Sequence, residues 1–141
     1  MLELCKQIAL KAHEGQMYGD KPYSYHLEQV VNQMNDHETD AKMVAWLHDI
    51  IEDGHVSGKQ LTELGVPEHV VEAVGLLTKM HGETYVQYIN NICTNRLAMR
   101  VKEADLVANI ANGPCKSLRE RYIKALAVIL TAEVNVMTYR G

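Results

Sequence analysis

Cysteine is scarce in this 141-residue chain and is not spaced for cross-linking or for a metal cage. The three residues, Cys5, Cys93 and Cys115, are odd in number and lie far apart. That pattern is typical of free thiols in a reducing compartment and argues against a disulfide framework. No Cys-x-x-Cys pair occurs, which argues against a zinc site built from cysteines.

Long apolar runs and an excess of positive charge are also missing. No stretch approaches the roughly 20 apolar residues needed to cross a bilayer. The first thirteen residues carry Glu3 and Lys6 inside their apolar pattern, unlike a signal peptide. The net charge of -4 provides no broad basic surface for DNA or RNA. We therefore expect a cytoplasmic protein that binds neither nucleic acid nor membrane, and the sequence leaves its oligomeric state undetermined.

Alternation of apolar and polar residues with period two is absent, whereas helical spacing of apolar residues recurs along the chain. Capping boxes at 57–60 and 117–120 and a cap at Asn95 indicate where helices begin. The expected helices cover residues 2–13, 23–34, 41–54, 57–65, 67–79, 83–92, 96–112 and 117–138. We predict one all-α domain, residues 1–141, of seven or eight helices.

The segment AKMVAWLHDIIEDG, residues 41–54, carries an unusual group of polar side chains. On a helix its apolar residues form one stripe, and His48, Asp49, Glu52 and Asp53 lie on the opposite side. Three carboxylates then crowd the last turn, where the helix dipole is already negative and favours basic residues. The segment is either a solvated acidic face or part of a cation site.

A cation site needs donors from other parts of the chain. His26 begins an earlier helix, and Asp105 interrupts an apolar run in which a lone carboxylate is costly to bury. Two histidines and two aspartates suit Mn²⁺ or Fe²⁺, whereas Zn²⁺ prefers tetrahedral closure and Mg²⁺ prefers oxygen ligands alone. Such an open site favours hydrolysis. Glu52 and Asp53 could then orient or deprotonate the attacking water.

Two further histidines, His13 and His55, stand at the ends of expected elements. His13 ends the first expected helix, and we expect it to pack or cap there rather than to bind a ligand. His55 borders the acidic turn. It either neutralises that turn or enters the substrate cleft.

Five ordered blocks of sequence carry a family resemblance. They are AHEGQ at 12–16, PYSYH at 22–26, LHDIIEDG at 47–54, LLTK at 76–79 and RVKEADLVANI at 100–110. Together they resemble the HD-domain metal-dependent phosphohydrolases. The match is closer to the hydrolase domain of the RelA/SpoT group and its small stand-alone relatives, which remove pyrophosphate from the 3′ position of guanosine tetra- and pentaphosphate.

The resemblance implies roles for particular residues. Glu52 and Asp53 correspond to the catalytic pair of the family, and Asn109 to an asparagine near the ribose or phosphate. Lys79 belongs to one of the matching blocks. The resemblance also implies a manganese site with the ligands His26, His48, Asp49 and Asp105.

The loop after Gln16 departs from the family pattern. Related hydrolases carry an Arg-Lys pair there, but this loop reads MYGDK and is one residue shorter. Tyr18 stands where arginine is expected and Lys21 is the only base, so these two are the loop's candidates for contact with the substrate. The arginines and threonine that follow the last metal ligand in the family are replaced by LVANIAN. The remaining candidates for phosphate contact are Lys79, Arg96, Arg100 and Lys102.

The sequence therefore predicts a Mn²⁺-dependent phosphohydrolase of a nucleotide, with guanosine tetraphosphate as the leading substrate. Fe²⁺, Mg²⁺ and Zn²⁺ are the alternative ions. One alternative function is a nucleotidase or pyrophosphohydrolase acting on another nucleotide. The other is a non-catalytic domain that binds metal and nucleotide for regulation.

Overall fold

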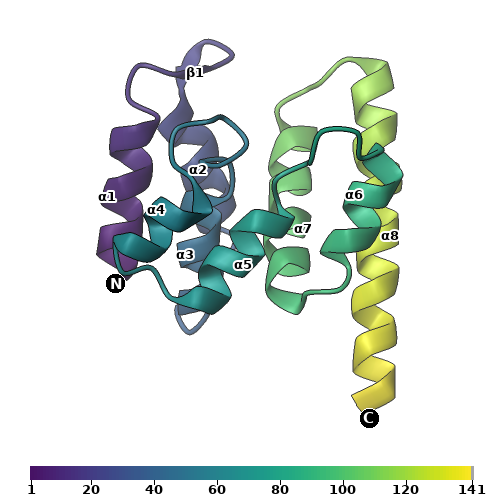
Figure 1. Ribbon diagram of the computed structural model, residues 1–141. Helices are drawn as coiled ribbons and strands as arrows, with labels where there is room; N and C mark the ends of the chain where they lie inside the picture. The colour runs from purple at the N-terminus through teal and green to yellow at the C-terminus, as the bar shows by residue number, and fades with distance from the viewer. Residues whose placement is uncertain (141) are drawn as a thin grey trace.

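The computed structural model describes residues 1–140, with side chains described as far as Val136. Eight helices and one short pair of strands make up this part of the chain (Figure 1). The helices are α1 (Leu2–Ala12), α2 (Tyr23–Val31), α3 (Thr39–Leu47), α4 (Gly58–Glu63), α5 (Glu68–Leu76), α6 (Tyr85–Ile92), α7 (Arg96–Ala111) and α8 (Lys116–Arg140). The predicted all-α fold of seven or eight helices is confirmed.

Local capping signals set several of the helix ends. At the start of α4, Ser57 Oγ accepts a hydrogen bond from the backbone N–H of Gln60 at 3.1 Å, which completes the predicted capping box. Asn95 caps α7 through a 2.9 Å bond from the N–H of Ala98. The predicted cap at Ser117 is wrong, because α8 begins one residue earlier and Ser117 lies inside its first turn.

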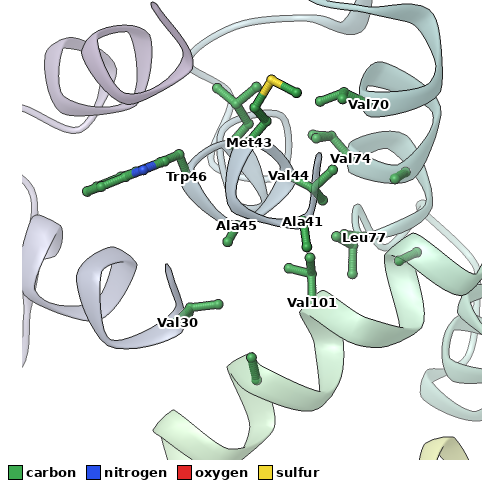
Figure 2. Close-up of a cluster of buried hydrophobic side chains, with 14 of the residues drawn as sticks. Val30, Ala41, Met43, Val44, Ala45, Trp46, Val70, Val74, Leu77 and Val101 are labelled. Carbon is green, nitrogen blue, oxygen red and sulfur yellow. The ribbon is translucent and has the colours of Figure 1, made fainter. Parts of the chain in front are cut away.

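Helix α3 forms the centre of the hydrophobic core. It contacts α1, α2, α5 and α7, and six of its nine residues are buried. Figure 2 shows Val44 of α3 near Val74 of α5 and Val101 of α7. Trp46 points away from these two helices. Burial of each such side chain contributes about 1.5–3 kcal/mol relative to exposure. This packing holds the end of α3 firmly between α2 and α7.

The predicted helix over residues 41–54 is wrong beyond Leu47, where α3 ends and a series of tight turns begins. The imidazole Nδ1 of His48 donates a 2.7 Å hydrogen bond to the carbonyl oxygen of Ala45. In a continuing α-helix that carbonyl would accept from the backbone of Asp49 instead. The next backbone bond, from Ile50 to Leu47, spans only three residues. His48 and Asp49 therefore need not diverge by the 100° of a regular helix.

A small hairpin between α1 and α2 was not predicted. Strand β1 (Met17–Tyr18) pairs antiparallel with β2 (Lys21–Pro22), with Tyr18 opposite Lys21. Gly19 in the connecting turn has a φ of 62°, a conformation that glycine adopts without steric cost. Strands of two residues are too short to show a periodic pattern. The hairpin brings Tyr18 over the start of α2.

The last helix, α8, packs along α7 and α6 and continues beyond the rest of the fold (Figure 1). Leu118, Arg121 and Tyr122 of α8 line one cleft together with residues of α6 and α7. Within the described residues, we find no helix that has both the length and the apolar character needed for a transmembrane span.

Candidate metal centre and cleft

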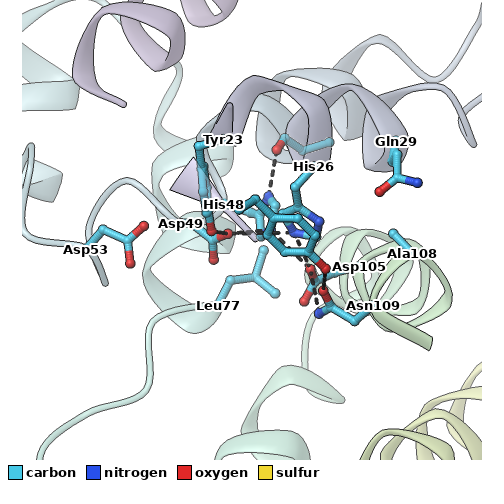
Figure 3. A network of polar contacts seen from close by, with 12 residues as sticks. Tyr23, His26, Gln29, His48, Asp49, Asp53, Leu77, Asp105, Ala108 and Asn109 are labelled. Atoms are coloured by element: carbon cyan, nitrogen blue, oxygen red, sulfur yellow. Dashed lines mark hydrogen bonds and ion pairs between the residues drawn. The ribbon is translucent and has the colours of Figure 1, made fainter. Parts of the chain in front are cut away.

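Side chains from α2, α7 and the turn after α3 meet at one buried point (Figure 3). His26 Nε2 lies 2.9 Å from Asp105 Oδ1 and 3.9 Å from Asp49 Oδ2. His48 Nε2 lies 3.0 Å from Asp49 Oδ2 and 3.3 Å from Asp105 Oδ1. The structure thus brings together all four residues that the sequence indicated as metal ligands.

The orientation of His48 suits a cation ligand. Its Nδ1 donates to the Ala45 carbonyl oxygen, which can only accept a hydrogen bond. Nε2 therefore faces the carboxylates of Asp49 and Asp105. These carboxylates outweigh the effect of burial and raise the pKa of His48 well above its usual value, so the metal-free ring carries a positive charge. A divalent cation would take the place of the proton on Nε2, between the same two carboxylates.

Lys102 and Asp105 determine the charge of the α7 side of the site. Burial disfavours ionisation of Asp105, but the Lys102 ammonium at 2.9 Å and the two imidazoles outweigh it and hold the pKa of Asp105 well below its usual range. Burial would lower the pKa of Lys102, and the Asp105 carboxylate reverses that effect and raises it. Both groups are therefore charged at neutral pH.

Two tyrosines orient the ligand side chains. Tyr23 donates a hydrogen bond from its hydroxyl to Asp49 Oδ2, and burial with the Asp49 charge raises the pKa of that hydroxyl. The ring of Tyr18 stacks on His26 with centroids 4.5 Å apart, and its hydroxyl donates to Asn109 Oδ1 at 2.6 Å. Tyr18 and Asn109, both predicted to contact substrate, thus lie at the edge of this group.

A cleft of about 370 Å³ adjoins the four residues. Seven of the side chains named from the sequence line it: Tyr18, His26, Asp49, Glu52, Lys79, Asp105 and Asn109. Lys102, a weaker candidate, lines it as well. Sequence reasoning missed several lining residues from α6 and α8: Tyr85, Tyr88, Leu118, Arg121 and Tyr122. No motif marks these positions, because only the packing of α6 and α8 turns them toward the cleft.

Glu52 and Asp53, the two acids after the His48-Asp49 pair, lie in different environments. Glu52 lines the cleft together with Lys79. Partial burial there, with the nearby Asp49 charge, raises the pKa of Glu52. Asp53 does not line the cleft and lies apart from the metal-centre residues in Figure 3. It accepts a 2.9 Å hydrogen bond from Gln16 Nε2.

Two of the predicted substrate contacts do not border the cleft. The Lys21 ammonium lies over the ring of Tyr25, 5.1 Å from its centroid. Arg96 lines separate surface pockets that it shares with Arg100. The roles proposed for Lys21 and Arg96 stay predictions.

Comparison with solved structures gives an informative match. No family model matches the chain, and no curated protein matches its sequence. Its fold matches a solved structure of a metazoan ortholog of SpoT, a protein described as hydrolysing ppGpp and playing a role in starvation responses. The TM-score is 0.73 at 22% sequence identity, covering 93% of this chain and 84% of the other. The chain therefore has the fold of that SpoT ortholog, as the sequence blocks predicted.

Proposed function

We propose that this chain is a metal-dependent phosphohydrolase that removes the 3′-pyrophosphate of guanosine tetra- or pentaphosphate. The observation that carries the proposal is the group of two imidazoles and two carboxylates beside a cleft that contains Glu52 and several cations. The shared fold of a ppGpp-hydrolysing protein supports it. The free cysteines support a reducing, cytoplasmic location.

A divalent ion would be held by His26, His48, Asp49 and Asp105. Two nitrogen and two oxygen donors favour Mn²⁺ or Fe²⁺, and we propose Mn²⁺. When bound, such an ion polarises a phosphoryl oxygen and makes water acidic enough to attack near neutral pH. Tyr23 holds the Asp49 carboxylate in place through its hydroxyl. The Ala45 carbonyl holds the His48 ring with Nε2 toward the site.

Glu52 is the proposed proton acceptor for the attacking water. Its raised pKa brings it closer to neutrality, where a carboxylate is a more effective base. The family resemblance also pairs Asp53 with Glu52, and a direct role for Asp53 stays a prediction because it lies outside the cleft lining.

Positive side chains along the cleft would bind the phosphate groups of the substrate. Lys102 is already paired with Asp105, so Lys79 and Arg121 are the better candidates. The guanidinium of Arg121 stacks over the ring of Tyr85, 3.7 Å from its centroid. A planar guanidinium can bind two phosphate oxygens at once. Asn109 adds an amide at the same edge.

A second candidate function is hydrolysis of a different nucleotide. The basic pair that the alarmone hydrolases carry in the loop after Gln16 is absent here. Lys21, the one base in that loop, lies over Tyr25 and does not line the cleft. The base or the pattern of phosphates could therefore differ from guanosine tetraphosphate.

A nucleotide panel tests the proposal. The Mn²⁺-loaded protein is incubated with guanosine tetraphosphate, guanosine pentaphosphate and other nucleotides, and released pyrophosphate and phosphate are measured separately. Pyrophosphate from the guanosine polyphosphates is the expected result. Release from other nucleotides alone would favour the second candidate. Nucleotide binding without any release would overturn both and indicate a regulatory binding domain.

A further inference from the structure

A second group of metal-ligating side chains lies outside the cleft, where the end of α1, the loop before β1 and the turn after α3 come together. His13, Asp53 and His55 each place one potential ligand atom within 4.8 Å of the other two. None of the three lines the cleft described above. The group is therefore separate from the candidate metal centre.

The amide of Gln16 lies between these three side chains. Its Oε1 is 2.8 Å from His13 Nδ1 and 2.7 Å from His55 Nε2, and its Nε2 is 2.9 Å from Asp53 Oδ2. His13 Nδ1 is itself 3.8 Å from Asp53 Oδ2. Donors about 2.1 Å from a tetrahedral ion are separated by about 3.4 Å, so these spacings need only small side-chain shifts to surround one.

Burial and charge favour a cation at this point. His13 is 4% exposed, and its ring stacks on Tyr23 with centroids 4.6 Å apart, so its orientation is fixed by packing. Burial lowers the pKa of His13, which keeps the ring in the neutral form that binds metals. Asp53 and His55 are exposed, so an ion can enter from solvent and keep water ligands.

We propose that His13, Asp53 and His55, with the amide oxygen of Gln16, form a second divalent-metal site that takes a zinc-class ion. Two imidazoles and one carboxylate suit Zn²⁺ or Co²⁺ better than Mg²⁺ or Ca²⁺, which prefer oxygen ligands. In the metal-free network both imidazoles donate to Gln16 Oε1, so binding moves each ring proton to its other nitrogen.

The second ion links segments that carry parts of the cleft. It joins the end of α1 to the turn after α3, next to the hairpin that contains Tyr18. As a ligand of this ion, Asp53 would stay outside the cleft, where Glu52 is the one lining carboxylate that is not a proposed ligand of the first ion. The second site does not depend on the proposed hydrolase activity, because it rests only on the contacts among its own four residues.

Zinc content of four proteins tests this site: the wild type, His55→Ala, Asp49→Asn and the double variant. Each is stripped with a chelator, incubated with excess ZnCl₂, desalted and analysed for zinc per chain. We expect His55→Ala to hold one ion fewer than the wild type and the double variant one fewer than Asp49→Asn. His55 is exposed, so its replacement leaves no cavity. The matched control, exposed His81→Ala, should retain the wild-type content.

Equal zinc content in His55→Ala and the wild type would overturn the second site. Nitrogen NMR of the histidine rings gives an independent readout in the Asp49→Asn variant, which retains His13 and His55. Zinc should shift His13 Nδ1 and His55 Nε2 there, and unshifted nitrogens would also overturn it. Absence of pyrophosphate release would count against the proposed hydrolase alone, because zinc content is measured without substrate.

Discussion

Lys102 Nζ lies 2.9 Å from Asp105 Oδ2, one turn further along α7, in an ion pair whose side chains are only 12% and 7% exposed. The other oxygen of Asp105 faces His26 and His48. One carboxylate therefore balances a buried ammonium on one side and completes the candidate metal centre on the other. Its removal should affect both stability and metal binding.

Asp105→Asn should lower the free energy of unfolding of the metal-free protein by about 3–5 kcal/mol, because it leaves the Lys102 charge buried without its partner. Urea denaturation measures the change. The matched control is Asp40→Asn, which breaks an exposed pair with His69 and should cost at most about 1 kcal/mol. Equal losses in the two variants would contradict the importance of the buried pair.

Mn²⁺ should stabilise the wild-type protein against unfolding by mass action. At an ion concentration of about 100 times Kd the gain is about 2.7 kcal/mol. Asp49→Ala should abolish most of this gain and the hydrolase activity together, since it removes a proposed ligand. Thermal melts with and without Mn²⁺ measure the shift. An undiminished shift in Asp49→Ala would place the ion elsewhere.

Glu52→Gln should retain Mn²⁺ and reduce kcat by about 10²–10⁴-fold, because glutamine keeps the shape of the side chain but cannot accept the proton. Steady-state kinetics and metal analysis on the same preparation separate the two effects. Glu63→Gln, an exposed change at the end of α4, serves as the control. An unchanged rate in Glu52→Gln would remove Glu52 from the mechanism.

Arg121→Ala should raise KM by about 10–100-fold, because it removes a charge-assisted hydrogen bond to phosphate. Such a bond contributes about 1.5–3 kcal/mol to binding. Lys124→Ala is the control, since Lys124 lies on the same helix but lines only the groove between α6 and α8. Initial rates over a range of substrate concentrations give both KM values. If the two variants behave alike, Arg121 does not bind the substrate.

Glu38 should make stability depend on pH through its pair with Arg100 at 2.8 Å. The hydrogen bond from Arg100 lowers the pKa of Glu38 in the folded protein. The stabilisation is therefore fully present above the unfolded pKa of about 4.3 and is lost as pH falls through the lower folded value. Glu38→Gln should flatten the acid side of the stability profile, and exposed Glu28→Gln should not. Urea midpoints at successive pH values measure both.

Sequence patterns predicted those features that depend on neighbouring residues. The capping box at Ser57 and Gln60 and the cap at Asn95 are bonds across three residues, so the local sequence contains both partners. The unpredicted capping box of α6, between Thr84 and Gln87, is equally local and could have been found in the same way. The capping pattern at Ser117 failed because α8 begins earlier.

The ligand residues of the candidate metal centre could also be predicted from the sequence. Two histidines and two aspartates interrupt segments whose apolar residues otherwise follow helical spacing. Their convergence required the packing of α3 against α2 and α7. The same packing ends α3 at Leu47, where His48 binds the Ala45 carbonyl, so a helical projection of residues 48–53 was misleading.

By itself, the sequence determined the helical class, most helix starts and the set of candidate ligands, since each rests on spacing or on bonds between near neighbours. Only the tertiary structure separated Glu52 from Asp53, brought Arg121 and Tyr85 to the cleft and buried the Lys102–Asp105 pair beside it. These outcomes depend on which distant segments pack together and on what each buried charge meets there. No local pattern contains that information.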